Sequence, residues 1–465
     1  MADSLHPDAQ APVRSSRWSL IEVGALVLAV VFAHLVYRHG LSLPIVYDAA
    51  DYWRIAEEIW SQGLFKPFSF ADLRTYGYPS LLGGMLWLAR LLGVESRWFV
   101  FELQLLLHLL GADAVRRALA ITSASPTNRR VVYCSLLLNP VVLIYPAYAI
   151  TESVSLTLTM LLFACSVRSI FGDTPLLALG AGSFLCGLVV MIRPSNLFLS
   201  VPWTLVVLVT LLRRTGSWRR AAAWAVPLSL AAAVPLLPQV RNNVVFFDVL
   251  SPLPAGDLRK LQHAYGVQML KYATACIPGQ APEVPYLNPL ADQDAATEPS
   301  LGWYAVHPLA GLATAALHIF NVLDQDLPLP YNTTLTPWYY PAVSIANLAV
   351  VAVGSLGLGV AVRRMRGRPG RRRLLLWAVV MALACHLGLH STVAVETRFG
   401  APALMILYPF AALTSGYALR IRRRRSSIPL LATVIALVAA GTALSGWVRD
   451  QAPAIRAAEL VRSGG

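Results

Sequence analysis

Long apolar runs alternate with short polar segments along this sequence, at a spacing typical of a chain that crosses a membrane many times. A helix needs about 20 mostly apolar residues to cross the hydrocarbon core of a bilayer. Eleven runs have this character, at 19–37, 97–117, 131–149, 152–170, 176–192, 196–212, 221–238, 339–362, 374–394, 400–419 and 428–447. The pattern therefore predicts an all-α fold, a polytopic transmembrane helix bundle of about 11 spans.

One further apolar segment, Pro79–Leu92, is shorter than the others. It has 14 residues, with Gly83 and Gly84 near its middle. Segments of this length dip into the membrane or lie along it more often than they cross it. We expect a re-entrant or interfacial helix here.

Composition supports the membrane assignment. Of the 465 residues, 56% are hydrophobic and 13% are charged, which is far from the balance of a soluble domain. Four of the five cysteines fall in apolar runs and Cys276 stands alone in a loop, a spacing that suits neither a disulfide framework nor a metal cluster. The first 13 residues are too polar for a signal peptide, so we expect the first run to remain as an anchor.

Arginine clusters orient the helices. They stand at 116–117, 129–130, 213–214, 219–220, 363–373 and 420–425. Cytoplasmic loops of membrane proteins collect Lys and Arg, so the N-terminus and all these clusters are placed in the cytoplasm. The segments 38–96 and 239–338 and the C-terminus then face the periplasm or cell exterior. Counting Pro79–Leu92 as a crossing would move the 116–117 cluster outside, which favours a dip.

The net charge of +14 has the same explanation. A charge of this size is also seen in proteins that bind nucleic acid, but here the positive residues stand at helix ends. Orientation in the membrane and contact with anionic lipid headgroups account for them. We therefore expect a protein of the cytoplasmic (inner) membrane that has no nucleic-acid partner.

Three parts follow from these boundaries. Residues 1–238 form an N-terminal transmembrane module that includes the outer loop 38–96, and residues 339–465 form the C-terminal helices. Between them, segment 239–338 holds eleven prolines, so we expect it to fold around short helices. Tyr304–Phe320 has helical apolar spacing and is expected to lie flat on the membrane face. The segment is longer than a connection needs, which predicts a lid with a mobile part.

The first outer loop begins with two carboxylates, Asp48 and Asp51, followed by an amphipathic pattern that predicts a helix ending before Gly63. Acidic residues three apart at a helix start are typical of an N-cap and its partner. A carboxylate at this place also suits catalysis at the membrane surface. The pattern alone leaves both interpretations open for Asp48.

Several short stretches stand out along the chain. In order they are Asp48 with Tyr52, Ala56 and Gly63, then Arg74–Leu82, Pro146 with Thr151 and Glu152, Arg193-Pro194, Arg241-Asn242, and Glu396-Thr397-Arg398-Phe399 with Pro402. Taken together and in this order, they resemble the GT-C glycosyltransferases, and more narrowly the bacterial branch near protein O-mannosyltransferases and the lipid A aminoarabinose transferase. The chain departs from the family at Phe399, where a Tyr is usual, and at Ala49, where the family has a second acidic residue.

The resemblance implies a GT-C-like architecture and an enzyme that moves a sugar from a polyprenyl-phosphate carrier to a lipid, glycan or protein acceptor outside the cytoplasm. It implies that Asp48 is the general base, because an attacking hydroxyl must lose its proton. Arginines would hold the leaving phosphate, since guanidinium groups fork onto phosphate oxygens. The substrate-binding residues implied are Asp51, Tyr52, Arg74, Tyr78, Glu152, Arg193, Arg241, Glu396 and Arg398.

Each of these residues also has a structural interpretation. Arginines at helix ends snorkel to lipid headgroups, and Glu396 with Arg398 is equally consistent with a structural ion pair. Glu152 at a helix start, with Thr151 as N-cap, is stabilised by the helix dipole. His386 and His390 stand four apart inside a span, which is more typical of packing than of a metal site.

Motifs for nucleotide or zinc binding do not occur in the sequence, so we expect the reaction to be driven by an activated lipid. No nucleotide cofactor is expected, and a divalent metal remains possible. The main alternative function is a multi-span transporter or lipid flippase, and a weaker one is a scaffold of a cell-envelope assembly. Transporters place charged residues near mid-membrane in broken helices, whereas here they gather at one face, which favours the transferase.

Overall fold

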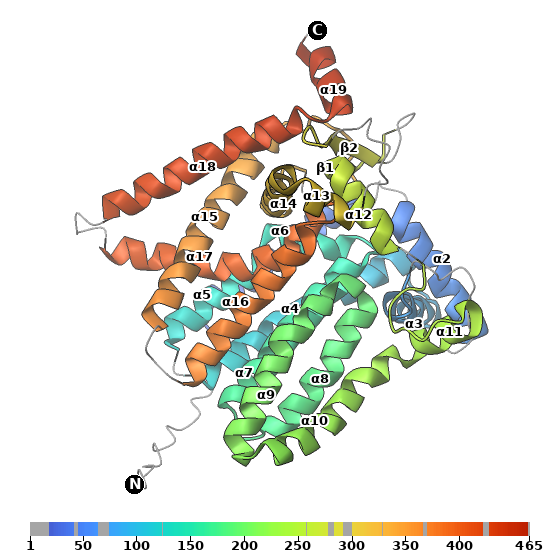
Figure 1. Ribbon diagram of the computed structural model, residues 1–465. Helices are drawn as coiled ribbons and strands as arrows, with labels where there is room; N and C mark the ends of the chain where they lie inside the picture. The colour runs from blue at the N-terminus through green and yellow to red at the C-terminus, as the bar shows by residue number, and fades with distance from the viewer. Residues whose placement is uncertain are drawn as a thin grey trace.

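Long helices account for most of the chain in the computed structural model (Figure 1). The structure describes residues 18–40, 45–63, 74–122, 124–256, 258–277, 283–291, 300–327, 329–365, 370–421 and 427–463. In these ranges ten helical segments are long and apolar enough to cross a membrane, or 11 if a bent pair at 126–147 counts as one span. The predicted all-α bundle is confirmed, and the chain is a multi-pass membrane protein.

The N-terminal half packs around one central helix, α7. In chain order its elements are α1 (Leu20–Gly40), α2 (Tyr47–Gln62), α3 (Gly77–Leu92), α4 (Ser96–Ala120), α5 (Pro126–Leu137), α6 (Pro140–Leu143), η1 (Tyr145–Ala147), α7 (Thr151–Phe171), α8 (Pro175–Ile192), η2 (Pro194–Leu199), α9 (Ser200–Thr215), α10 (Trp218–Ala233), η3 (Val234–Leu236) and α11 (Leu237–Phe247). α4 and α8 pack extensively on α7, and most side chains of α7 are buried.

The C-terminal half adds a small mixed region and four long helices. Its elements are α12 (Leu258–Gln268), β1 (Met269–Thr274), β2 (Glu283–Leu287), α13 (Leu301–Val306), α14 (Pro308–Leu323), α15 (Tyr340–Met365), α16 (Arg371–His390), η4 (Thr397–Gly400), α17 (Ala401–Ile421), α18 (Ser427–Arg449) and α19 (Pro453–Ser463). α15 packs against both α17 and α18, so these three helices form one side of the bundle (Figure 1).

The run 131–149 is not the single straight span that the sequence predicts. α5 ends at Leu137, and the Asn139 side chain caps the next turn by accepting a hydrogen bond from the Val141 N–H at 3.1 Å. Pro140 has no N–H to continue the preceding helix and disfavours the helical conformation at the residue before it. The two parts are bent by 43°, so Asn139 and Pro140 convert this run into a broken span.

Segment 239–338 contains the expected short helices and, in addition, a β-hairpin that the sequence analysis did not predict. β1 and β2 pair antiparallel, and isolated parallel bridges join Tyr272 to Glu396 and Ala275 to Asn332. The two residues of each bridge are far apart in the sequence, so no local sequence pattern predicts the bridges. The helix expected over Tyr304–Phe320 is divided at His307, because Pro308 starts a new helix, α14.

The short helices α2 and α3 pack closely on each other. The buried face of α2 carries Ile55, Ala56 and Ile59, at the spacing the sequence predicts. A Cβ added at Gly83 would lie 2.8 Å from the Ala56 carbonyl oxygen, so only glycine permits this approach. At 16 residues, α3 is not among the helices long enough to span, and its predicted dip into the membrane stays a prediction.

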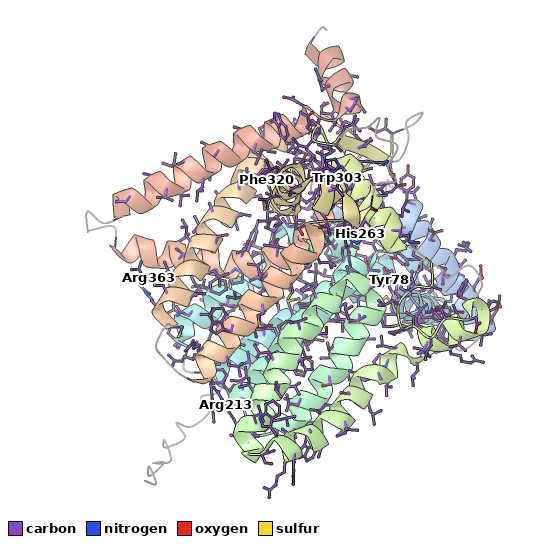
Figure 2. The ribbon with its side chains drawn as sticks, in the orientation of Figure 1. Tyr78, Arg213, His263, Trp303, Phe320 and Arg363 are labelled. Atoms are coloured by element: carbon purple, nitrogen blue, oxygen red, sulfur yellow. The ribbon has the colours of Figure 1, made fainter. Side chains whose placement is uncertain are left out.

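The two ends of the bundle differ in character. Arg213 and Arg363 lie at helix ends remote from His263 and Trp303, which belong to the mixed region (Figure 2). α9 runs from near Arg193 to Arg213, and α16 begins at Arg371 and ends at His390 before η4. The starts of η2, α7 and η4 therefore share the end that is opposite to the arginine runs.

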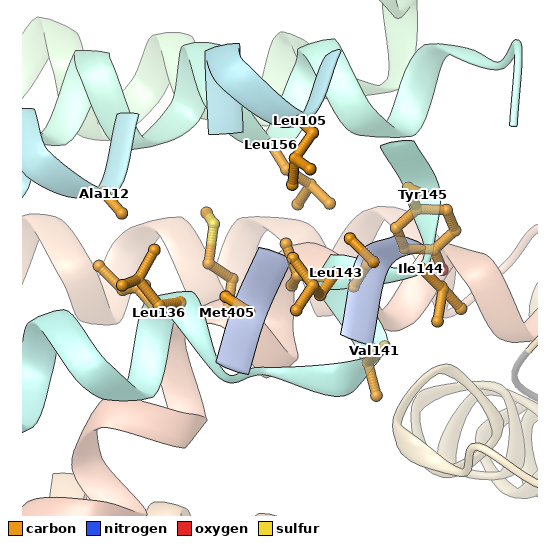
Figure 3. Packing of buried hydrophobic residues seen from close by; sticks show 14 of the residues in the cluster. Leu105, Ala112, Leu136, Val141, Leu143, Ile144, Tyr145, Leu156 and Met405 are labelled. Carbon is orange, nitrogen blue, oxygen red and sulfur yellow. The ribbon is translucent and has the colours of Figure 1, made fainter. Parts of the chain in front are cut away.

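A hydrophobic cluster fixes the start of α17 beside α7. Leu105 of α4, Leu136 of α5, Leu156 of α7 and Met405 of α17 are all buried in it (Figure 3). In a bilayer such side chains stabilise the bundle by close van der Waals packing, because lipid tails are as apolar as the core. This packing places η4, just before α17, next to the first turn of α7, although the two are more than 200 residues apart in the sequence.

Candidate active site

Asp48 lies in the first turn of α2, where two arginines occupy both of its carboxylate oxygens. Arg74, just before α3, donates from Nη2 to Oδ1 at 2.5 Å, and Arg398 of η4 donates from Nη2 to Oδ2 at 2.6 Å. The N-cap of α2 is Val46, and no side chain caps the helix. The capping interpretation of Asp48 is therefore wrong, because the helix begins one residue earlier and the carboxylate turns toward the arginines instead.

Long-range contacts hold the start of α2 in place. Tyr47 has a left-handed φ of 50°, which is unusual for a bulky residue, and its hydroxyl donates to the Ala275 carbonyl oxygen at 3.1 Å. The Ala49 N–H donates to the Tyr331 hydroxyl oxygen at 3.2 Å. Segment 239–338 thus contributes to the position of Asp48, and backbone strain at this residue is typical of a functional site.

Glu152 and Glu396 join Asp48 through Arg398. The Nε of Arg398 lies 3.5 Å from Glu152 Oε1 and 2.6 Å from Glu396 Oε2, and Glu152 also forms an ion pair with Arg193. Asp48, Glu152, Glu396, Arg74, Arg193 and Arg398 are together called the charged cluster below. Three members lie within α2, α7 and η4, and the other three lie just before α3, η2 and η4. The cluster therefore exists only in the folded chain.

Glu152 is buried, with 4% of its surface exposed. α7 begins at Thr151 after an N-cap at Ile150, so the proposed capping role of Thr151 is wrong. The Thr151 hydroxyl instead donates to Glu152 Oε2 at 3.2 Å. With Arg193 and Arg398 beside it, this carboxylate is positioned by charges as well as by the start of the helix.

The surroundings shift the pKa values of Asp48 and Glu396 in opposite directions. Burial alone would raise the pKa of Asp48, but the ion pairs with Arg398 and Arg74 outweigh burial and hold the pKa well below its usual range. Burial raises the pKa of Glu396 to about 7, because Arg398 offsets it only in part and two other carboxylates are near. In this state Asp48 is a very weak base, and Glu396 readily holds a proton.

The β-hairpin reaches the charged cluster through Glu396. The Thr274 hydroxyl donates to Glu396 Oε1 at 3.0 Å, and the Tyr272 N–H donates to the Val395 carbonyl oxygen at 2.8 Å. Sequence reasoning missed Thr274, Tyr331 and Tyr47 as neighbours of the site. Their contribution comes from pairing between distant segments, for which the sequence carries no short-range signal.

Tyr52 and Tyr78 frame the cluster on the side of α3. Their rings meet edge to face at 5.2 Å, and the Arg74 guanidinium lies 5.2 Å from the centre of the Tyr52 ring. The Tyr78 hydroxyl donates to Gln104 at 3.3 Å inside the core. Tyr52 thus contacts the charged cluster directly, whereas Tyr78 packs against the Tyr52 ring.

Two residues predicted to bind substrate are not counted in the charged cluster. Asp51 is about half exposed and lies at the edge of the cluster, where it forms an ion pair with Arg74 at 3.5 Å. Arg241 is exposed on α11, and within the described ranges no ion pair joins it to the cluster. Its neighbour Asn242 accepts a hydrogen bond from the Tyr76 hydroxyl at 2.9 Å, so α11 supports the segment that carries Arg74.

The histidine pair His386 and His390 has a packing role in the structure. His386 Nε2 lies 3.0 Å from the Phe399 carbonyl oxygen, and the two imidazole rings contact each other at 4.7 Å. Among the described residues, no group of three or more His, Cys, Asp or Glu side chains is placed to hold a metal ion. Phe399, where the resembled family has Tyr, lies 5.0 Å from the Arg193 guanidinium.

The structure contains an apolar cavity and a smaller, more polar hollow. The apolar cavity, of about 290 Å³, runs between α4, α5, α7, α9, α16 and α17, from Phe198 and Pro402 toward Arg372, and no member of the charged cluster is among its lining residues. The more polar hollow lies beside α2, includes Ala49 next to Asp48, and is lined by aromatic side chains that include Trp53, Tyr148 and Tyr331.

Neither a protein-family model nor a curated protein matches this sequence. Among solved structures, the fold is similar to that of ArnT from Cupriavidus metallidurans bound to undecaprenyl phosphate, with a TM-score of 0.46 and 15% sequence identity over 95% of this chain and 73% of that chain. A likeness at this level is too low to transfer residues, ligand or reaction to the present protein.

Proposed function

We propose that this protein is an integral-membrane glycosyltransferase that moves a sugar from a polyprenyl-phosphate carrier to a lipid, glycan or protein acceptor. The observation that carries the proposal is the charged cluster, in which three arginines and three carboxylates from separate segments meet at one end of the bundle. This end is opposite to the arginine runs, so by the positive-inside rule it faces the periplasm or cell exterior of the cytoplasmic membrane.

The arginines suit the leaving group of this reaction. When the bond between the sugar and the carrier breaks, negative charge grows on the lipid phosphate and needs fixed cations. Arg74 and Arg398 both point a guanidinium group at the same carboxylate, Asp48. A phosphate that enters beside Asp48 would meet two forked donors, the arrangement best matched to phosphate oxygens.

The carboxylates suit the attacking group. The acceptor hydroxyl loses its proton as its oxygen attacks the anomeric carbon, and we assign Asp48 as the base. Glu152, held by Arg193 and Arg398, would keep the arginines aligned or contact the sugar. Asp51, Tyr52 and Tyr78 remain proposed contacts at the edge of this site, and Arg241 is proposed only as a more distant one.

The apolar cavity offers room for part of the carrier's hydrocarbon chain. It begins at Phe198, whose ring lies 4.8 Å from His386, and His386 contacts the backbone of Phe399 next to Arg398. A polyprenyl chain in this cavity would place its phosphate toward the cluster. The chain would exchange contacts with lipid tails for contacts with the apolar lining, so close van der Waals packing would favour its entry.

The experiment is transfer from polyprenyl-phosphate sugars by purified protein in liposomes, with release of free polyprenyl phosphate as the readout. The Asp48→Asn change removes the base and should lower the rate about 10²–10⁴-fold at normal expression. Asp51→Asn is the matched control, since Asp51 is half exposed, and it should cost much less. Glu152→Gln should fall between these two.

Two outcomes would contradict the proposal. Full activity of Asp48→Asn would remove the general base assignment and leave Asp51 or Glu152 to be tested for it. Movement of the intact sugar lipid across the liposome membrane, with no release of polyprenyl phosphate, would identify a lipid flippase instead.

A further inference from the structure

We infer that the donor's phosphate draws Arg74 away from Asp48, so that Asp48 becomes a base only after the donor has bound. The inference rests on the proposed function and concerns how the same site is switched on. It starts from the geometry of the cluster, in which both oxygens of Asp48 already accept hydrogen bonds from arginines at 2.5 and 2.6 Å. A carboxylate held in this way is a poor base, because each of its oxygens already accepts a hydrogen bond from a cation.

Carboxylate and phosphate compete for the same guanidinium groups. Both are anions that accept the two parallel hydrogen bonds of an arginine fork. Each arginine of the charged cluster already has a carboxylate partner, since Arg74 pairs with Asp48, Arg193 pairs with Glu152, and Arg398 contacts all three carboxylates. A donor phosphate must therefore take an arginine from one of the carboxylates.

Arg74 is the arginine that can leave. Arg398 contacts three carboxylates and is 10% exposed, and Arg193 is held by Glu152 and by Ser195. Among the described residues, the ion-pair partners of Arg74 are Asp48 and, at 3.5 Å, Asp51, and its side chain is 26% exposed. It lies outside the helices, just before α3, so its movement breaks no helical hydrogen bond.

The exchange changes Asp48 from a weak base into a stronger one. Loss of Arg74 removes one of the two cations that favour the charged carboxylate, and the phosphate adds a negative charge beside it. Both changes raise the pKa of Asp48. The groups that act on Asp48 from the elements around it are Arg74, Arg398, Glu396, Tyr52, Tyr272 and Tyr331, and of these only Arg74 is moved in the exchange.

The reaction then balances as one displacement. The acceptor oxygen forms a bond with the anomeric carbon while its proton passes to the freed Oδ1 of Asp48. The bond from the anomeric carbon to the phosphate oxygen breaks, and the electron pair leaves with the polyprenyl phosphate, which Arg74 and Arg398 hold. Release of that product returns Arg74 to Asp48, and the proton is lost to solvent as the pKa falls again.

Carbodiimide labelling of Asp48, measured by peptide mass spectrometry, tests the exchange. Carbodiimides react with protonated carboxyl groups, so labelling at fixed pH follows the protonated fraction. Undecaprenyl phosphate is the probe, and its binding is measured separately by saturable quenching of tryptophan fluorescence. Glu58, on the same helix, serves as the internal reference carboxylate.

In wild-type protein, undecaprenyl phosphate should raise Asp48 labelling about tenfold or more, the factor that follows from a pKa rise of one unit. Arg74→Gln should reach a similar level without lipid, and lipid should add little to it. Arg90→Gln is the matched control, because it breaks another ion pair between α3 and α2, Arg90–Glu57 at 3.0 Å, and should leave Asp48 labelling at the wild-type level.

The outcomes separate the two proposals. If undecaprenyl phosphate binds wild-type protein while Asp48 labelling stays the same or falls, the exchange is wrong and the phosphate site stands. Equal labelling of lipid-free Arg74→Gln and wild type overturns the exchange as well. If undecaprenyl phosphate does not bind at all, the proposed function fails, and the exchange fails with it.

Discussion

At the scale of single residues, Arg398 has the most demanding position, because three carboxylates from separate segments depend on it. Its guanidinium group contacts Asp48, Glu152 and Glu396. Buried acids remain charged at little cost only where cations and hydrogen bonds compensate them. Loss of this one side chain would leave the cluster with three acids and two arginines.

Replacement of Arg398 by methionine should therefore destabilise the protein strongly. Removing one partner of a buried ion pair costs about 3–5 kcal/mol, and we expect a loss of that order in the free energy of unfolding in detergent. The matched control is Arg90→Met, whose partner Glu57 is exposed, and whose cost should stay below about 1 kcal/mol. Equal losses in the two variants would mean that Arg398 is not the centre of the cluster.

Glu396 gives the protein a predicted pH dependence of stability. Its folded-state pKa of about 7 lies above the ordinary value of 4.5, so the native state holds this proton to higher pH than the unfolded chain. The stabilisation is complete below about pH 4.5 and is lost as the pH rises through about 7. Asp48, with its lowered pKa, acts in the opposite sense but only in more acidic solution.

The melting temperature of the wild type should thus fall between about pH 5 and pH 8, and Glu396→Gln, which has no proton to lose, should flatten that part of the curve. The measurement is thermal unfolding in detergent across this range. Curves of equal slope for the two proteins would show that Glu396 ionises in the folded state as it does in the unfolded chain.

At the scale of elements, the contact between α2 and α3 is decided by two neighbouring glycines that differ in their surroundings. A Cβ at Gly83 would meet the Ala56 carbonyl oxygen at 2.8 Å, whereas a Cβ at Gly84 would meet nothing within 4 Å. Gly83→Ala should separate the helices and cost about 1–3 kcal/mol. Gly84→Ala should be neutral or slightly stabilising, because alanine favours the helix.

The melting temperature and the transfer activity should both fall in Gly83→Ala, since α3 follows soon after Arg74 and α2 carries Asp48. Unfolding and activity that match the wild type in both variants would show that the α2–α3 contact tolerates a methyl group and does not position the site.

The predictability of these elements depended on the range of the interactions that form them. Apolar runs and the 3.6-residue period predicted the spans, α2 and α14, because those signals are local. The break at Asn139 and Pro140 was missed, because the apolar run 131–149 is long enough to form a single span. The hairpin was not predictable, since β1 obtains its partners from residues near 283–287, 332 and 396.

At the scale of the whole molecule, orientation in the membrane remains a prediction from the arginine runs. A single cysteine at Ser300, in protein without its five native cysteines, should react with an impermeant maleimide in intact cells. A cysteine at Ser217, between two arginine pairs, should react only after permeabilisation. Ser69, in the first outer loop, is a second predicted outer position for the label and lies outside the described residues. The reverse pattern at Ser300 and Ser217 would invert the topology and place the charged cluster in the cytoplasm.

The site residues, like the elements, divide into those that a local sequence pattern predicts and those that only the tertiary fold reveals. Asp48, Glu152, Arg193 and Arg398 were chosen through short motifs, and the fold brings all four together. Arg241 was chosen for the same reason and lies apart from the cluster. A short motif locates a residue on a helix, but it does not determine how that helix is oriented in the fold. Tyr331 and Thr274 needed the tertiary fold to be found.

The ion pair between Asp48 and Arg398 joins residues that are 350 positions apart, and this has a consequence for biosynthesis. Ribosomes deliver Asp48 and Glu152 to the membrane long before Arg398 emerges, so while most spans are inserted these acids have only Arg74 and Arg193 as partners. A nascent chain that stops before residue 398 would lack the arginine that joins the two ion pairs and would leave its carboxylates incompletely compensated beside the bilayer. We expect such truncated chains to be recognised and degraded, so that cells contain the complete protein or very little of it.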